Sequence, residues 1–151
     1  MCTRQNVKEM LQKVLFLAGE VEVTQGNFNN DIGVPLTLWG MRDDVDSRVL
    51  ELGANHIGEI AYTSRMVGAD VAILNNAQEA HLYGFGGLGG VVKAKGEIIT
   101  GPSKKGQVVL NLDDPHFLVW QTLAQSRRVW SFSLSNEKAS VYASAIERTS
   151  R

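Results

Sequence analysis

Glu51 is a carboxylate placed where it could do chemistry, because it directly follows the apolar residues Val49 and Leu50 and lies two residues before Gly53. A carboxylate at the end of a hydrophobic strand can reach a hard cation such as Mg²⁺, which prefers oxygen ligands. The ordinary alternative is a solvated carboxylate at a strand end, and the residue pattern alone favours that alternative.

His81 and Lys95 are two further candidates. His81 lies one short loop beyond the apolar segment 70–74, where an imidazole can serve as a metal ligand or a base. A loop histidine that bonds its neighbours is the alternative. A basic pair such as Lys93 and Lys95 usually belongs to a solvated helix face, but Lys95 comes three residues after Val92 and four after Val91, a spacing compatible with the buried side of an expected helix. An ammonium group there needs a partner or a modification.

Paired amides and a glycine-rich stretch are weaker signals. Asn29-Asn30 and Asn75-Asn76 lie in expected loops, where asparagine is common for backbone reasons. The glycines between Gly84 and Gly90 are not followed by the Lys-Ser or Lys-Thr ending of a phosphate-binding loop. A flexible connection is therefore the favoured interpretation, ahead of a phosphate cradle.

The elements that must position these side chains alternate along the chain. Helices are expected at 7–18, 32–39, 58–67, 91–99 and 115–124, and strands at 21–24, 47–52, 70–74, 107–112, 128–132 and 139–146. This order predicts an α/β fold with a mainly parallel sheet flanked by helices. Ligands of such sheets bind beyond the carboxyl ends of the strands, and the polar stretches 24–30, 51–56, 75–81 and 111–114 fall there.

The first expected helix has the clearest pattern. Its apolar face is predicted to consist of Val7, Met10, Leu11, Val14, Leu15 and Ala18. Asn6 is expected to cap its beginning, and Gly19 to end it.

Length and composition exclude several classes of protein. The 151 residues suit one domain or part of a larger one, and 15 basic against 16 acidic residues give no basic face for nucleic acid. Cys2 is the single cysteine, which excludes a disulfide framework and a cysteine-based zinc cluster and suits a reducing compartment. No apolar run near the start could span a membrane, and charged residues interrupt any signal-peptide core.

Several stretches together resemble the central ATPase domain of the Mur ligases. The most specific are GNFNNDIGVPLTL at 26–38 and ELGANHIGEI at 51–60. VKEM at 7–10, the Asn75-Asn76 pair, Ala80-His81-Leu82 and KAKGEI at 93–98 agree in order and spacing. The resemblance runs from about Asn6 to the C-terminus.

The resemblance implies an ATP- and Mg²⁺-dependent amide ligase of cytoplasmic peptidoglycan precursor synthesis. In this family ATP phosphorylates the terminal carboxylate of a UDP-linked peptide, and an amine then displaces phosphate from the acyl phosphate. The stretches look most like the branch that adds D-alanyl-D-alanine to a UDP-N-acetylmuramoyl-tripeptide. A branch with another amino-acid substrate is an alternative that the stretch 26–38 disfavours.

The resemblance also implies roles for single residues. Glu51 looks like the Mg²⁺-binding carboxylate near the β- and γ-phosphates, and His81 like a ligand of a second Mg²⁺. Lys95 matches the lysine that the family carbamylates, and a carbamate is an anion that can help hold the second metal. Asn75 is assigned to the nucleotide side. The loops that line the muramoyl-peptide side match Thr24, Asn27, Asn29, Asn30, Asn55 and His56.

The chain departs from the family at its beginning. Thr3, Arg4 and Gln5 stand where the family's phosphate-binding loop has a glycine, a lysine and a hydroxyl residue. Arg4 keeps the positive charge but not the backbone cradle, and Gln5 is a poor substitute for a small hydroxyl at a metal.

From these departures we expect a central domain over residues 1–151 that is incomplete at both ends. The N-terminal UDP-binding domain and the C-terminal domain of the family are expected to be absent. A strand that normally lies inside the sheet is also expected to be missing, and the exposed edge favours self-association. A non-catalytic ligase remnant that binds a partner or nothing is the alternative to an enzyme component.

Overall fold

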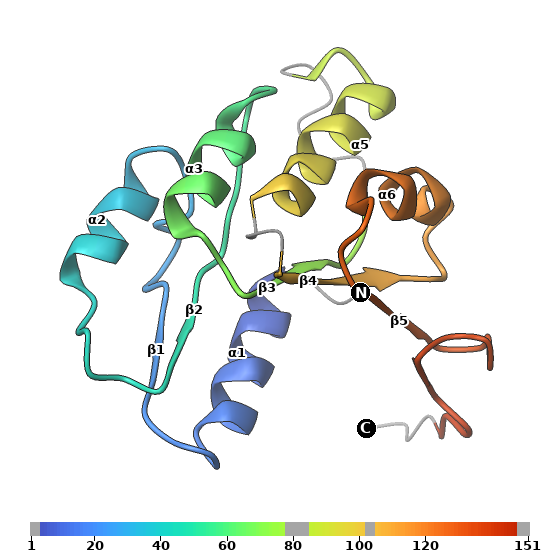
Figure 1. The fold of residues 1–151 in the computed structure, drawn as a ribbon, viewed down its shortest axis with the longest axis horizontal. Coiled ribbons are helices and arrows are strands. Elements are labelled where there is room, and N and C mark those ends of the chain that lie inside the picture. Colours follow the sequence, from blue (N-terminus) through green and yellow to red (C-terminus); the bar gives the residue numbers. More distant parts are fainter. Residues whose placement is uncertain (1–3, 78–84, 102–104, 148–151) are drawn as a thin grey trace.

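Helices and strands alternate along the chain in the computed structural model, which describes residues 4–77, 85–101 and 105–147. Figure 1 shows these elements and their labels. The helices are α1 (Arg4–Leu15), α2 (Gly33–Gly40), α3 (Glu59–Val67), α5 (Leu88–Gly96), the 3₁₀ helix η1 (Glu97–Thr100) and α6 (Phe117–Ala124). The strands are β1 (Val21–Val23), β2 (Ser47–Val49), β3 (Val71–Leu74), β4 (Gln107–Asn111), β5 (Val129–Ser133) and β6 (Val141–Tyr142).

The described strands form two parallel sheets. β1 pairs with β2, with Val21 opposite Ser47, and the second sheet has the order β3-β4-β5-β6. Every strand pair in both sheets is parallel. Figure 1 shows α5 and α6 over one face of the larger sheet and α1 on the opposite side. The predicted α/β class with a mainly parallel sheet flanked by helices is confirmed.

The main core lies between the larger sheet and the helices α5 and α6. Val108 and Leu110 alternate along β4 and are fully buried against Trp120, Ile99 and Ala124. The indole N–H of Trp120 donates a hydrogen bond to the Val92 carbonyl at 3.2 Å. This bond satisfies the one polar group that the large side chain carries into the core.

The first helix differs from its predicted form. It runs from Arg4 to Leu15, so Asn6 does not cap its beginning and Gly19 does not end it. Met10 and Val14 are 62% and 64% exposed, whereas Lys8 is buried. α1 packs on β1 and β2, and only a narrow stripe of a helix can face two short strands.

Other boundaries also differ, and the predicted strand 47–52 ends at Val49. The predicted helix 91–99 is the helix α5 followed by the 3₁₀ turn η1. The predicted strand 139–146 contains only the pair Val141–Tyr142, because pairing with β5 covers no more than these two residues. Within the described ranges, no helix combines the length and the apolar character that a membrane span requires.

Candidate functional site

Glu51 lies just beyond β2 and joins two segments that are far apart in the sequence. Its Oε1 accepts a hydrogen bond from Nδ2 of Asn29 at 3.0 Å, and its backbone N–H donates to Oγ1 of Thr24 at 2.9 Å. The Asn29 carbonyl accepts the Gly53 N–H at 2.7 Å. The carboxyl ends of β1 and β2 therefore form one hydrogen-bonded unit around a carboxylate that is 11% exposed.

The loop after β1, residues 24–30, has the conformation that this unit needs. Thr24 is fully buried and its N–H donates to the Val49 carbonyl, which extends the pairing of the two strands. Gly26 follows with a φ of 51°, in the left-handed region that glycine adopts without a steric penalty. Asn27 is exposed, and its carbonyl accepts the Asn29 N–H at 2.7 Å.

Asn30 is mainly a structural residue in this arrangement. Its side-chain oxygen accepts the N–H of Gly33 at 2.7 Å, and its carbonyl accepts the N–H of Val34 at 3.0 Å. These bonds connect the loop to the first turn of α2. Of the paired asparagines, Asn29 therefore faces Glu51 and Asn30 holds the following helix.

Asn55 and His56 meet at a second carboxylate, Glu59. The Asn55 N–H donates to Oε2 of Glu59 at 2.8 Å, and Nδ1 of the exposed His56 lies 2.8 Å from Oε1. Burial opposes the charged form of Glu59, but the bonds from Asn55 and His56 outweigh it and lower the pKa of Glu59 below its ordinary value. The turn 55–59 is therefore held by a charged side chain that we did not predict.

Another unpredicted carboxylate, that of Glu97, holds the beginning of α3. It accepts the N–H groups of Gly58, at 2.8 Å, and of Ala61, at 3.0 Å. A negative charge is favourable at a helix N-terminus, where N–H groups lack partners within the helix. Glu97 thereby connects η1 to the segment that carries Asn55 and His56.

Lys95 reaches the end of β3. It is half-buried on α5, and its Nζ donates to the Asn76 carbonyl at 2.9 Å, whereas Lys93 is exposed. The prediction that Lys95 lies on the partly buried side and needs a partner is confirmed. Asn75 is half-buried in the same loop. The loop is also held by Asp114, which accepts the Ala77 N–H at 3.0 Å.

Two predicted residues are not described in full. His81 lies outside the described residues, and so does the side chain of Arg4. The side chain of Gln5 donates to Oε1 of Glu9, four residues further along α1, at 3.1 Å. Within the helix, Gln5 therefore bonds a neighbour of the same exposed surface.

The described residues fit one kind of magnesium site. Among them, no three His, Cys, Asp or Glu side chains come close enough to hold a metal ion by themselves. Mg²⁺ is usually bound by one or two carboxylates together with phosphate oxygens and water. Among the described residues, Glu51 is a hard carboxylate at a strand end, and it suits an ion that also binds phosphate oxygens and water.

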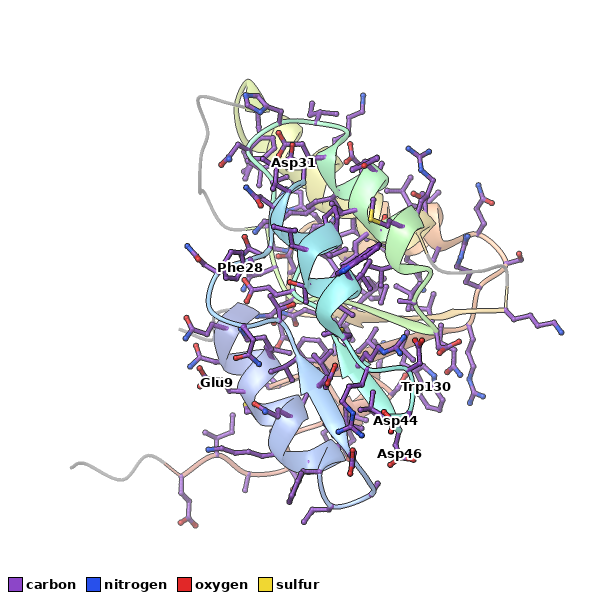
Figure 2. All side chains as sticks on the ribbon, turned by 90° about the vertical axis from the view of Figure 1, so that its left-hand side faces the viewer. Glu9, Phe28, Asp31, Asp44, Asp46 and Trp130 are labelled. Atoms are coloured by element: carbon purple, nitrogen blue, oxygen red, sulfur yellow. The ribbon has the colours of Figure 1, made fainter. Side chains whose placement is uncertain are left out.

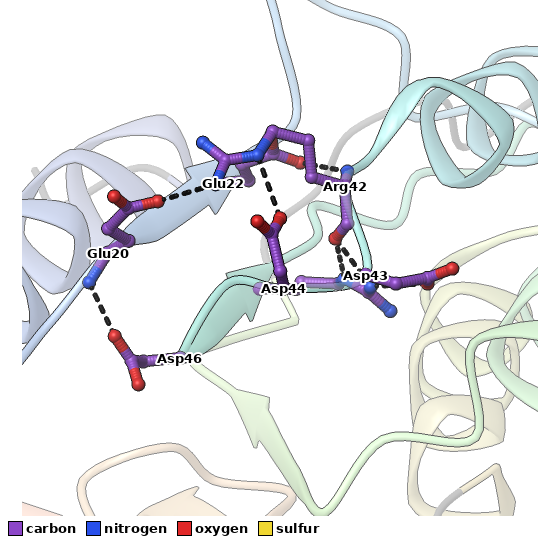
Figure 3. A network of polar contacts seen from close by, with 7 residues as sticks. Glu20, Glu22, Arg42, Asp43, Asp44 and Asp46 are labelled. Atoms are coloured by element: carbon purple, nitrogen blue, oxygen red, sulfur yellow. Dashed lines mark hydrogen bonds and ion pairs between the residues drawn. The ribbon is translucent and has the colours of Figure 1, made fainter.

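The opposite ends of β1 and β2 carry a surface network of charges (Figure 3). Arg42 lies 2.9 Å from both Glu20 and Asp44, and Asp46 accepts the Glu20 N–H at 2.8 Å. The hydrogen bond and charge of Arg42 lower the pKa of Asp44. This network is exposed and lies at the end of the two strands that is remote from Glu51.

A shallow hollow of about 380 Å³ lies between β1 and α2, and its lining includes Phe28, Leu36 and Met41. Figure 2 views this side of the molecule and shows Phe28 at its surface. Glu51 does not line the hollow. The hollow is therefore separate from the Glu51 carboxylate, although residues of the loop 24–30 contribute to both.

Comparison with known proteins gives the same family from sequence and from structure. A family described as "Mur ligase middle domain" matches residues 6–151. The UDP-N-acetylmuramoyl-tripeptide–D-alanyl-D-alanine ligase of Escherichia coli K12 is 45% identical over 147 residues, which cover 97% of this chain and 32% of that protein. The ligase of the same name from Haemophilus influenzae is 44% identical over 86% of this chain and 29% of its own length.

Solved structures agree with these relatives. A crystal structure of MurF from Acinetobacter baumannii superposes with a TM-score of 0.90 at 38% identity, covering 96% of this chain and 31% of that one. MurF from Thermotoga maritima, solved in complex with ADP, has a TM-score of 0.78 at 29% identity, over 88% of this chain and 31% of its own. The chain spans about a third of the length of the relatives it matches.

Proposed function

The chain belongs to the Mur ligase family, and on this premise we propose that it is the central part of a ligase that adds D-alanyl-D-alanine to a UDP-N-acetylmuramoyl-tripeptide. In the proposed reaction the γ-phosphoryl group of ATP passes to the terminal carboxylate of the peptide and ADP leaves. The amine of D-alanyl-D-alanine then attacks the acyl carbon, phosphate leaves and an amide bond forms. This chain alone is not expected to complete that reaction.

The observation that carries the proposal is the bonded unit of Glu51 and the loop 24–30. The two stretches that resemble the family most specifically, 26–38 and 51–60, are the ones joined by the hydrogen bonds of Asn29 to Glu51 and to Gly53. Relatives that are 45% and 44% identical over 97% and 86% of the chain carry the ligase name. The carboxylate of Glu51 and the loop 24–30 form one unit. This suits a reaction that brings the γ-phosphoryl group of ATP to the carboxylate of a peptide.

The proposed metal roles rest on the chemistry of the donors. Glu51 offers carboxylate oxygens to a Mg²⁺ ion that also binds nucleotide phosphates, and such an ion offsets the charge of the transferred phosphoryl group. His81 is proposed as a ligand of a second Mg²⁺. Lys95 is proposed to be carbamylated, which would replace the ammonium that now donates to Asn76 with an anion.

The proposed binding roles are divided between two sides. Arg4, Gln5 and Asn75 are proposed for the nucleotide. Thr24, Asn27, Asn29, Asn30, Asn55 and His56 are proposed for the muramoyl-peptide side. The exposure of Asn27, Asn55 and His56 suits direct contact, whereas buried Thr24 suits a role in shaping the loop. A cytoplasmic location is proposed on the same family premise.

A non-catalytic role is the second candidate, and one observation favours it. Gln5, which stands for the metal-binding hydroxyl of the family, is a helical residue bonded to Glu9. A chain with this arrangement would retain the fold of a ligase and act, if at all, as a binding module.

We predict that replacing Glu51 with glutamine abolishes Mg²⁺-dependent ATP binding. Glutamine keeps an oxygen that can accept from Asn29 and removes the charge that attracts the cation. Its amide nitrogen would then face the Lys8 ammonium, so circular dichroism must show that the variant is folded before the titration is interpreted. The measurement is a Mg²⁺-ATP titration of the purified chain by calorimetry. Glu137→Gln, an exposed carboxylate in another part of the chain, is the matched control and should bind as the wild type does.

The two outcomes separate the candidate functions. Saturable binding in the wild type and the control that is lost in Glu51→Gln supports the ligase component. A folded wild-type chain that binds no Mg²⁺-ATP, or a Glu51→Gln variant that binds it unchanged, contradicts the proposed role and favours the non-catalytic candidate.

We also propose that the chain associates with itself through a sheet edge. β2 pairs only with β1, and β3 only with β4, among the described strands, so each sheet ends in a strand with one unpaired side. Unpaired edges of parallel sheets are templates for strand addition. We predict that analytical ultracentrifugation over a hundredfold concentration range detects dimers or larger species. Monomers at every concentration would contradict self-association.

A further inference from the structure

Lys8 is a buried cation that the proposed function does not use. Its side chain is 9% exposed, although it projects from α1, whose Met10 and Val14 are largely exposed. Burying an ammonium group is costly unless carbonyl or carboxylate oxygens replace its water. Oxygen atoms of neighbouring residues must therefore replace the water that the Lys8 ammonium loses on burial.

The groups around Lys8 come from both parts of the candidate site. Its Nζ donates to the Thr24 carbonyl at 2.9 Å and to the Gly26 carbonyl at 3.2 Å. It also lies 3.8 Å from Oε2 of Glu51, an ion-pair distance too long for a hydrogen bond. One ammonium group thus meets the loop 24–30 and the carboxylate at the end of β2.

We propose that Lys8 is a positioning residue, which holds Glu51 and the loop 24–30 in one fixed arrangement and ties both to α1. The proposal rests on the proposed function for its purpose, because a metal-binding carboxylate and a substrate loop gain from a fixed relative position. Asn29 and Lys8 face different oxygens of the Glu51 carboxylate, so the pair fixes the rotation of the carboxylate as well as its place.

The role differs from general stabilisation of the core. Lys8 lies outside the cluster around Trp120 and Leu110, and among the described residues its ammonium group contacts the loop 24–30 and Glu51. Removing the ammonium while keeping the aliphatic stem should therefore loosen the site selectively. Methionine is a suitable replacement, since it is unbranched and of similar length but uncharged.

The experiment compares Lys8→Met with Lys13→Met, an exposed lysine of the same helix, by NMR hydrogen exchange without nucleotide or metal. In Lys8→Met the Gly53 amide, which bonds the Asn29 carbonyl, should exchange at least about tenfold faster. The side-chain amide of Asn29 should move to the position of a solvent-exposed amide. Amides of β4 should change little, and Lys13→Met should match the wild type.

A second comparison distinguishes positioning from simple loss of stability. Val92→Ala weakens the main core without touching Lys8, so it should leave the Asn29 side-chain signal in place. An unchanged Gly53 rate and Asn29 signal in folded Lys8→Met would overturn the proposal, and so would the same displacement of that signal in Val92→Ala.

A measurement on the wild type decides the matter if Lys8→Met does not fold. Exchange at low urea concentrations should show the Gly53 and Glu51 amides opening together with the amides of α1, at the same free energy and with the same urea dependence. Independent opening of the loop would contradict the proposal. Because no step requires ATP or Mg²⁺, failure here is separate from failure of the Glu51→Gln titration.

Discussion

Trp120→Ala is expected to destabilise the chain by about 3–5 kcal/mol, the usual cost of truncating a buried aromatic residue. Trp120 is fully buried, and its indole N–H is bonded to the Val92 carbonyl. The variant would leave a cavity between α6, α5 and β4 and a carbonyl without its donor. A loss of this size is comparable with the whole stability of many single domains.

Equilibrium unfolding in urea measures the effect, with Trp39→Ala as the matched control. Trp39 is 93% exposed, so the same substitution there should change the free energy of unfolding by no more than about 0.5 kcal/mol. A Trp120→Ala variant as stable as Trp39→Ala would mean that the packing of α6 against β4 does not dominate the core.

The fold was largely predictable because its signals are local. β3 and β4 contain the short apolar runs Val-Ala-Ile-Leu and Val-Val-Leu, and β5 combines Val129, Trp130 and Phe132 with two serines. The extent of β6 was not predictable, since it depends on how far β5 offers a pairing partner. The division of the strands into two sheets was also not predictable, because the local sequence pattern does not determine which strands pair.

The candidate site was predictable where its position follows from the fold. Glu51, Thr24 and Asn29 were expected at strand ends, and parallel strands bring such ends together. Lys8 was missed because amphipathic analysis assigns a lysine to the solvent side. The spacing does contain one signal, because Lys8 lies on the same face of a helix as Leu11 and Leu15. In the structure Leu11 and Leu15 are half-buried, whereas Met10 and Val14, on another face, are exposed.

Glu59 and Glu97 were missed for a different reason. Glu59 is bonded to the backbone N–H of Asn55, just before α3, whereas Glu97 accepts the N–H groups of Gly58 and Ala61 from 36 to 39 positions away in the chain. A contact of that range depends on the packing of η1 beside α3. The sequence shows that a charged residue is present, but it does not show which backbone N–H groups that residue will bond.

Gly33 connects the stability of the fold with the geometry of the site, and Gly33→Ala is expected to disturb both. A Cβ at this buried position would lie 2.7 Å from the backbone Cα and carbonyl carbon of Phe28 and 3.0 Å from Oδ1 of Asn30. Backbone atoms cannot rotate away, so the loop 24–30 would have to shift. Such overpacking costs about 1–3 kcal/mol, although alanine by itself favours a helix by about 1 kcal/mol.

Gly40→Ala is the matched control, because it makes the same change at the other end of α2. No atom lies within 4 Å of a Cβ built there, so only the gain in helix propensity remains and the variant should equal or slightly exceed the wild type in stability. Urea unfolding gives both free energies, and the NMR signal of the Asn29 side chain reports the loop. The two substitutions should therefore differ in sign, and only Gly33→Ala should move the Asn29 signal. Equal stability of the two variants would show that the loop yields to the added methyl group, and a loop that yields so readily could not hold Asn29 against Glu51.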